Sequence, residues 1–76
     1  MEREITMTPY FQAGFAVMYA RKSLGLTQQD LALRSGIAQA DICRIESGHY
    51  NTSLKTLTRL AEAMGKIVRV SFVDPV

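Results

Sequence analysis

Apolar residues recur at helical spacing along most of the chain, which predicts a series of short helices. The first is expected from about Pro9 to Ser23 or Leu24, because a proline at the first helical position lacks only an N–H that has no helical partner. Gly25 marks its end. The side of this helix that is expected to face the core carries Ala13, Val17, Ala20 and Leu24.

A second apolar stripe on the same helix lies roughly opposite the first, because it is offset by two residues. Its members are Phe11, Phe15 and Met18. A small domain seldom exposes such a patch, so something is expected to cover it. Two covers are open at this point: the surface of a partner protein, or the chain's own residues from Ile5 to Met7 folded back over the helix.

Residues 27–36 read as a capped helix that ends in a sharp turn. Thr27 is followed three positions later by Asp30, a carboxylate variant of the capping box that begins many helices. Leu31 and Ala32 are expected on the buried side of this helix. Gly36 gives the turn a backbone that tolerates positive φ, which a tight connection between two helices requires.

A second short helix is expected to begin near Gln39 and to bury Ile42 and Ile45, which lie three positions apart on one face. The residues that then point away from the core are Gln39, Ala40, Asp41 and Arg44. Glutamine pairs bidentately with adenine and arginine with guanine, so such a helix suits the major groove of DNA. Two helices joined in this way form a helix-turn-helix.

The remaining chain consists of a final helix and a tail of different character. Ser53 is expected to cap a helix from Leu54 to Met64, which Gly65 ends. Residues 66–73 are rich in β-branched side chains, and apolar and polar residues partly alternate along them, which is typical of a strand. The predicted organisation is therefore an N-terminal segment over residues 1–8, a helix-turn-helix domain over 9–65, and a C-terminal strand and tail over 66–76.

A single strand leaves its own backbone N–H and C=O groups without partners. Within the chain, only residues 3–7 offer further sequence that could pair with it. Pairing with the same strand of a second copy, as an antiparallel two-fold ribbon, is the economical solution. The residues expected in this dimer contact are Ile67, Val68, Val70 and Phe72.

Over residues 13–65 the order of these motifs closely resembles the Xre/Cro/C1-type helix-turn-helix family of phage and bacterial repressors. The residues that carry the resemblance are Thr27-Gln28, Leu31-Ala32, Gly36-Ile37, Gln39, Ile42, Arg44-Ile45-Glu46, Gly48, Ser53-Leu54, Leu57, Leu60-Ala61 and Met64-Gly65. It implies a mainly α fold, a lambda-repressor-like bundle of four to five short helices, here with a C-terminal β-strand that pairs across a dimer. Ala38 departs from the family, which usually has a serine or threonine there, so about 1 kcal/mol of cap energy is expected to be missing.

The resemblance also implies roles for the exposed residues of the second motif helix. Gln39 would read an adenine, and Arg44 would read a guanine or hold a phosphate. Ala40 would offer its methyl group to a thymine. Asp41 is an acid among phosphates, so it is expected either to accept from a cytosine amino group or to pair with Arg44, and a structural role is favoured.

Other positions are expected to contact the DNA backbone or to hold the domain together. Gln28 opens the first motif helix, where the family commonly touches a phosphate. Hydroxyl and amide groups that suit phosphate oxygens follow in the loop residues Tyr50, Asn51 and Thr52. Arg21 and Glu46 match a pair that forms an internal salt bridge in this family.

The tail narrows the resemblance, because a compact domain of this type followed by a hydrophobic strand looks like the HigA-type and HipB-type antitoxins of toxin–antitoxin pairs. That likeness implies a homodimer that represses its own operon at an inverted-repeat DNA operator and binds a cognate toxin protein. The second apolar stripe of the first helix is the candidate partner surface. Two alternatives stay open: a phage-type or restriction-modification controller regulator without a toxin, and a protein-interaction adaptor that lost DNA affinity.

The composition of the chain mainly argues against other classes of function. Nine Lys and Arg against seven Asp and Glu give a formal net charge of +2, a mild excess for a DNA-binding protein. The single cysteine, Cys43, is expected to be a small packing residue. His49 is the only histidine and lacks a set of partners for metal binding or catalysis, so no metal, cofactor or enzymatic activity is expected. Because no apolar run could span a membrane and residues 1–4 are not a secretory signal, a cytoplasmic protein is expected.

Overall fold

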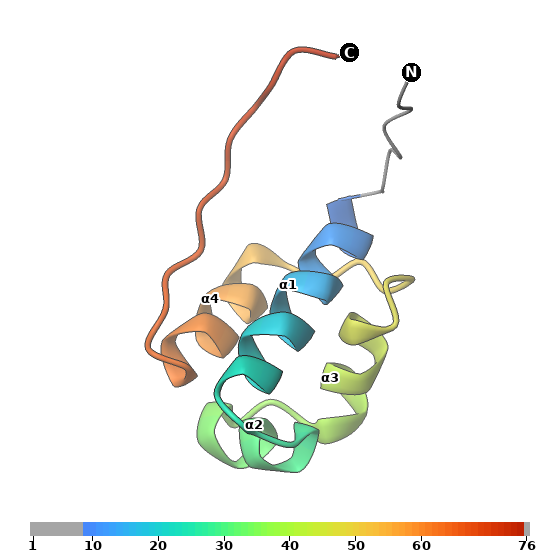
Figure 1. Ribbon diagram of the computed structural model, residues 1–76. Coiled ribbons are helices and arrows are strands. Elements are labelled where there is room, and N and C mark those ends of the chain that lie inside the picture. The colour runs from blue at the N-terminus through green and yellow to red at the C-terminus, as the bar shows by residue number, and fades with distance from the viewer. Residues whose placement is uncertain (1–8, 76) are drawn as a thin grey trace, which may run out of the picture.

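The structure is a computed structural model that describes the backbone of residues 9–75 and the side chains of residues 12–75. It is mainly helical, as predicted, and the described residues contain four helices. Their bounds are Pro9–Ser23 for α1, Gln28–Ser35 for α2, Gln39–Glu46 for α3 and Leu54–Ala63 for α4. Figure 1 shows α1 running through the middle of the bundle, with α3 and α4 on either side and α2 across one end. None of these helices is long and apolar enough to cross a membrane.

Every helix contributes a side chain to one small core. The buried residues of this core are Val17 from α1, Leu31 from α2, Ile42 and Ile45 from α3, Leu60 from α4 and Met64 just after it. Each fully buried aliphatic side chain stabilises the fold by roughly 1.5–3 kcal/mol. Because α2 and α3 have only eight residues each, neither would be stable alone, and both depend on this packing.

The helix ends follow the predicted local signals. The Thr27 hydroxyl accepts from the Asp30 N–H at 3.0 Å, while the Thr27 N–H donates to the Asp30 carboxylate at 2.9 Å, so the capping box is confirmed. Ser53 caps α4 through the Thr56 N–H. Gly36 has φ 75° at the turn after α2, as its position predicts. Ala38 gives α3 no side-chain cap.

One part of the α1 prediction was wrong. Leu24 was expected in the core, but α1 ends at Ser23 and Leu24 lies in the following turn, where it is 46% exposed. The buried stripe of α1 runs instead through Gly14, Val17 and Arg21. A methyl group at Gly14 would overlap the carbonyl oxygen of Ile45, so glycine is what allows α1 and α3 to approach closely.

The tail from residue 66 to residue 75 has no regular secondary structure, and the described residues contain no β-strand. Figure 1 shows this tail extended beside the bundle, and a groove separates it from α1 and α4. Its apolar side chains are largely in solvent: Ile67 is 85% exposed and Phe72 is fully exposed. Strand pairing across a dimer needs a second chain, so it stays a prediction. Residues 3–7, the other strand-like sequence, lie outside the described residues.

Candidate nucleic-acid interface

Helix α3 separates a buried side from an exposed side. Ile42 and Ile45 are 0% and 1% exposed, and they anchor the helix against the core. The exposed residues of the helix are Gln39, Ala40, Cys43 and Arg44. Cys43 was expected to be a packing residue, and this was wrong. It lies three and four positions after Ala40 and Gln39, so helical periodicity places it on their face, away from the core.

Arg44 is held by two neighbours on the surface. Its Nη2 donates to Asp41 Oδ1 at 2.7 Å, and its guanidinium carbon lies 5.3 Å from the centre of the Tyr50 ring. The Asp41 side chain is 40% exposed and the Arg44 side chain 59% exposed. Two roles were considered for Asp41, and the structure shows the one in which Asp41 pairs with Arg44. Tyr50 lies beyond the end of α3, and no periodic signal in the sequence indicates its contact with Arg44.

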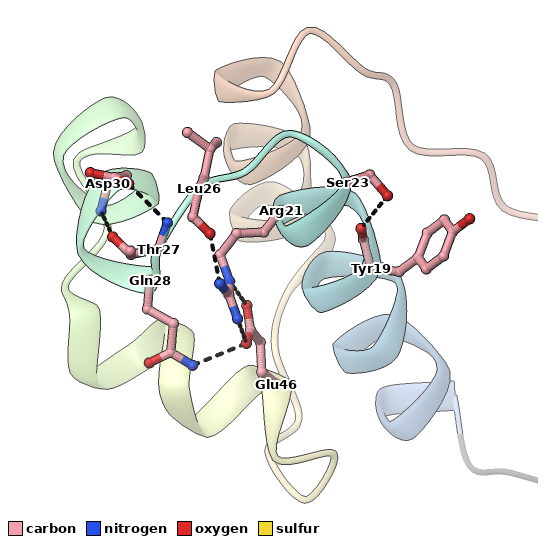
Figure 2. Close-up of polar contacts among 8 residues, drawn as sticks. All are labelled: Tyr19, Arg21, Ser23, Leu26, Thr27, Gln28, Asp30 and Glu46. Atoms are coloured by element: carbon pink, nitrogen blue, oxygen red, sulfur yellow. Dashed lines mark hydrogen bonds and ion pairs between the residues drawn. The ribbon is translucent and has the colours of Figure 1, made fainter.

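Behind this surface, a buried ion pair joins α1 to the end of α3 (Figure 2). Arg21 Nε and Nη2 donate to the two carboxylate oxygens of Glu46 at 2.7 and 2.8 Å. Arg21 Nη1 also donates to the Leu26 carbonyl at 2.8 Å, which fixes the connection between α1 and α2. The two charged side chains are only 9% and 4% exposed. The pair therefore sets where the C-terminal end of α3 lies relative to α1.

The same carboxylate also holds Gln28. Gln28 Nε2 donates to Glu46 Oε1 at 3.0 Å, and Figure 2 shows the amide oxygen turned away from Glu46. Burial by itself raises the pKa of Glu46, but the hydrogen bonds from Arg21 and Gln28 outweigh it and lower this pKa overall. Gln28 was expected to contact a DNA phosphate. The structure commits one of its two amide N–H groups inside the protein and leaves the contact a prediction.

The loop between α3 and α4 brings its polar residues next to α3. Tyr50 is 38% exposed, Asn51 is exposed and Thr52 is half-buried. All three line a shallow pocket together with Asp41 and Ile45. The side chains expected to meet phosphates therefore lie beside the helix expected to read bases. Within the described part of the chain, no group of histidine, cysteine and acidic residues could hold a metal ion.

The second apolar stripe of α1 is partly exposed. Phe15 is 51% exposed and stacks on Tyr19, which is 67% exposed, with 6.2 Å between the ring centres. Met18 is half-buried, and the side chain of Phe11 lies outside the described residues. Residues 5–7, the intramolecular cover considered above, also lie outside them. Tyr19 was missed as a member of this surface, although its position four residues after Phe15 is the signal for it.

Comparison with known proteins agrees with this arrangement. The sequence profile of the helix-turn-helix family matches residues 17–67. An uncharacterized HTH-type transcriptional regulator of Methanothermobacter thermautotrophicus is 46% identical over 46 residues, which cover 60% of this chain and 67% of that relative. A second such protein, from Sinorhizobium fredii, is 38% identical over 55 residues, covering 72% of this chain and 70% of the relative.

A third relative, an uncharacterized HTH-type transcriptional regulator of Haemophilus influenzae, is 39% identical over 51 residues. The match covers 67% of this chain but only 52% of that protein, so the chain spans about half of the relative's length. All three relatives are named as transcriptional regulators, and the family match covers the whole of α2, α3 and α4. The chain therefore belongs to the helix-turn-helix family of the Xre/Cro/C1 type, a family of DNA-binding transcriptional regulators.

Proposed function

We propose that the protein is a homodimeric repressor that binds an inverted-repeat DNA operator with one α3 helix in each half-site. The observation that carries the proposal is the division of α3 into an anchored apolar side and an exposed side with amide and guanidinium groups. Gln39 would read an adenine, Arg44 a guanine, and the Ala40 methyl group a thymine. Each good bidentate contact discriminates against the wrong base by about 1–3 kcal/mol.

Phosphate contacts would set the register of α3 on the duplex. The candidates are Gln28 at the start of α2 and the loop residues Tyr50, Asn51 and Thr52. These residues supply neutral donors, which fix orientation without reading sequence. The formal net charge is a mild +2, but every lysine or arginine that meets a phosphate releases counterions, so binding should depend on salt.

The tail is the proposed dimer contact. Its apolar residues project from an extended segment that has no partner strand within residues 9–75. Pairing two such tails through Ile67, Val68, Val70 and Phe72 would satisfy the backbone groups along their shared edge and bring apolar side chains of the two copies together. The two α3 helices of the dimer would then meet half-sites about one helical turn apart, roughly 34–36 Å.

A narrower version of the proposal makes the protein the antitoxin of a toxin–antitoxin pair that represses its own operon. The stacked, exposed Phe15 and Tyr19 on α1 support a protein partner, because isolated domains seldom expose such a surface. A small toxin-like reading frame beside the gene, and a gel shift on the DNA upstream of it, would support this role. Without such a neighbour, a phage-type or restriction-modification controller regulator is favoured.

DNA should protect Cys43 from alkylation, because this sole cysteine lies on the exposed face of α3. The probe is a duplex selected by the protein from a random library. At a duplex concentration about tenfold above Kd, N-ethylmaleimide should modify Cys43 about tenfold more slowly than in free protein, since little free protein remains. Mass spectrometry follows the rate at which Cys43 is modified.

The matched control places the thiol elsewhere. Thr58 is exposed on α4, so Thr58→Cys in a Cys43→Ala background should react equally fast with and without the duplex. Equal protection of both thiols would indicate a different docking face. A protein that selects no sequence from the library and shows no salt-sensitive, saturable binding would refute the proposed function as a whole.

Shortening the chain to end at Lys66 should convert the dimer to a monomer. This cut keeps the Lys66 N–H to Ala61 carbonyl bond that closes α4, so the helical domain should remain folded. Analytical ultracentrifugation measures the mass, and circular dichroism checks the fold. The control ends at Val73 and keeps all four proposed contact residues, so it should stay dimeric. A dimer that survives the cut at Lys66 would contradict pairing through the tail.

A further inference from the structure

Arg44 is restrained from two directions before any ligand arrives. Asp41, one turn earlier in α3, accepts a 2.7 Å hydrogen bond from its Nη2. Tyr50, from the loop after α3, places its ring 5.3 Å from the guanidinium carbon. The hydrogen bond comes from α3 itself and the cation–π contact from the loop that follows it. Together the two contacts restrain the position of the Arg44 head group.

We propose that Asp41 and Tyr50 are positioning residues that direct Arg44 to a guanine and away from the phosphate backbone. The inference rests on the proposed function and deepens it by naming what sets the specificity of one base contact. A free arginine on a DNA-binding face serves a phosphate or a base equally well. The contacts around Arg44 bias that choice, for reasons of charge and of geometry.

Charge is the first reason. The Asp41 carboxylate is 40% exposed and touches the guanidinium, so it offsets the positive charge of Arg44 and repels a phosphate that approaches the same place. The edge of a guanine is neutral and carries no such penalty. Asp41 therefore weakens the sequence-independent component of binding more than it weakens the base contact.

Geometry is the second reason. A guanidinium has five N–H donors, and the bond to Asp41 uses one of them. The remaining donors still include pairs that match the O6 and N7 acceptors of guanine. Because the Tyr50 ring restrains the group, less side-chain freedom is lost when the bidentate contact forms. Tyr50 thereby favours a bidentate contact, and the charge of Asp41 makes the neutral edge of guanine a better partner for that contact than a phosphate.

The test uses the full chain and two readouts that a merely structural role would not move: base preference and salt dependence. Wild type, Arg44→Ala, Asp41→Asn, Tyr50→Leu and Tyr50→Phe are each used to select duplexes from a random library. Affinities for the selected duplex and for a scrambled duplex are then measured across salt concentrations. Thermal melts confirm that each variant is folded, which these surface positions make the expected result.

Wild type should enrich one guanine per half-site, and Arg44→Ala should lose that preference. Asp41→Asn should bind scrambled DNA more tightly, and its guanine preference should fall about tenfold. The slope of log affinity against log salt concentration should become steeper by about one for each Arg44 that is freed to meet a phosphate. Tyr50→Leu should lose the guanine preference without the steeper slope. Tyr50→Phe keeps the ring, so it should keep the preference even if the lost hydroxyl lowers affinity for every sequence.

Three outcomes would overturn the inference. The first is that Asp41→Asn and Tyr50→Leu both retain the guanine preference and salt slope of wild type. The second is that the preferred guanine persists in Arg44→Ala. The third is that Tyr50→Phe loses the preference as fully as Tyr50→Leu does. In each case wild type still selects a sequence, so the proposed function stands; failure of wild type to select any sequence would refute both.

Discussion

Glu46→Ala is expected to destabilise the fold by about 3–5 kcal/mol, because it leaves a charged guanidinium buried without its carboxylate. The Arg21 side chain is 9% exposed, and among the described residues only the Leu26 carbonyl would still accept a hydrogen bond from it. A domain of this size has a total stability of roughly 5 kcal/mol, so the variant should be largely unfolded at 37 °C. Urea unfolding followed by circular dichroism at 10 °C would measure the change.

The surface pair provides a matched control for this prediction. Arg44 and Asp41 make a hydrogen bond of the same 2.7 Å length as Arg21 and Glu46, but their side chains are 59% and 40% exposed. Asp41→Ala should therefore cost only about 0.3–0.5 kcal/mol. Arg21→Met combined with Glu46→Leu should recover most of the lost stability, because no buried charge remains. A loss below 1 kcal/mol in Glu46→Ala would contradict the importance assigned to burial.

The same pair gives stability a defined dependence on pH. The pKa of Glu46 is lowered from its ordinary value of 4.5, so the folded state binds a proton less readily than the unfolded chain. The contribution is fully present above about pH 4.5 and is lost as pH falls through the folded pKa. Glu46→Gln should flatten this part of the profile. Asp30→Asn is the control. Hydrogen bonds from Thr27 also lower the pKa of Asp30, but this carboxylate is exposed, so its replacement should change the profile less than Glu46→Gln does.

The sequence predicted the helices because their ends depend on local chemistry. The hydroxyl of Thr27 and the carboxylate of Asp30 act within one turn, and Gly36 adopts positive φ where the turn demands it. Ile42 and Ile45 are three residues apart, so periodicity alone identifies the buried face of α3. These signals lie within a few residues of the structure they produce, and they predicted the helix bounds to within about a residue and the buried face of α3.

Contacts between helices were harder to predict. Two apolar stripes compete on α1, and only the packing against α3 reveals that Gly14 and Arg21, not Leu24, belong to the buried side. Arg21 and Glu46 are 25 positions apart, and only the family resemblance suggested their pairing. The contact between Arg44 and Tyr50 depends on the path of a loop. Such features follow from the assembled fold, which no local pattern encodes.

Cys43 illustrates a different source of error. Its residue type favours burial, and this favoured a packing role. Its position, one residue after buried Ile42 and two before buried Ile45, places it on the exposed side of α3. For a helix whose buried face is already known, periodicity is therefore the stronger indicator, and residue type should be the weaker one.

Gly14→Ala is expected to destabilise the protein by about 2–3 kcal/mol, against the direction that helix propensity predicts. Within a helix, alanine is more favourable than glycine by roughly 0.5–1 kcal/mol, so a solvent-facing substitution would stabilise α1. At Gly14 the added methyl group meets the carbonyl oxygen of Ile45, which is backbone and cannot rotate away. Either α1 and α3 move apart or the variant unfolds. Urea unfolding of the variant and of wild type measures the change in the free energy of unfolding.

Two controls separate this overlap from other properties of glycine. Ala16 is exposed on α1, so Ala16→Gly should cost only the propensity term, roughly 0.5–1 kcal/mol. Gly25 has φ 72° and no atom within 4 Å of an added methyl group, so Gly25→Ala should show backbone strain alone, about 1–2 kcal/mol. If Gly14→Ala proves as stable as wild type, the close approach of the helices is not required. If it folds but binds DNA more weakly than its folded fraction explains, the spacing between α1 and α3 also affects DNA binding, as the proposed docking of α3 requires, since Ile45 belongs to that helix.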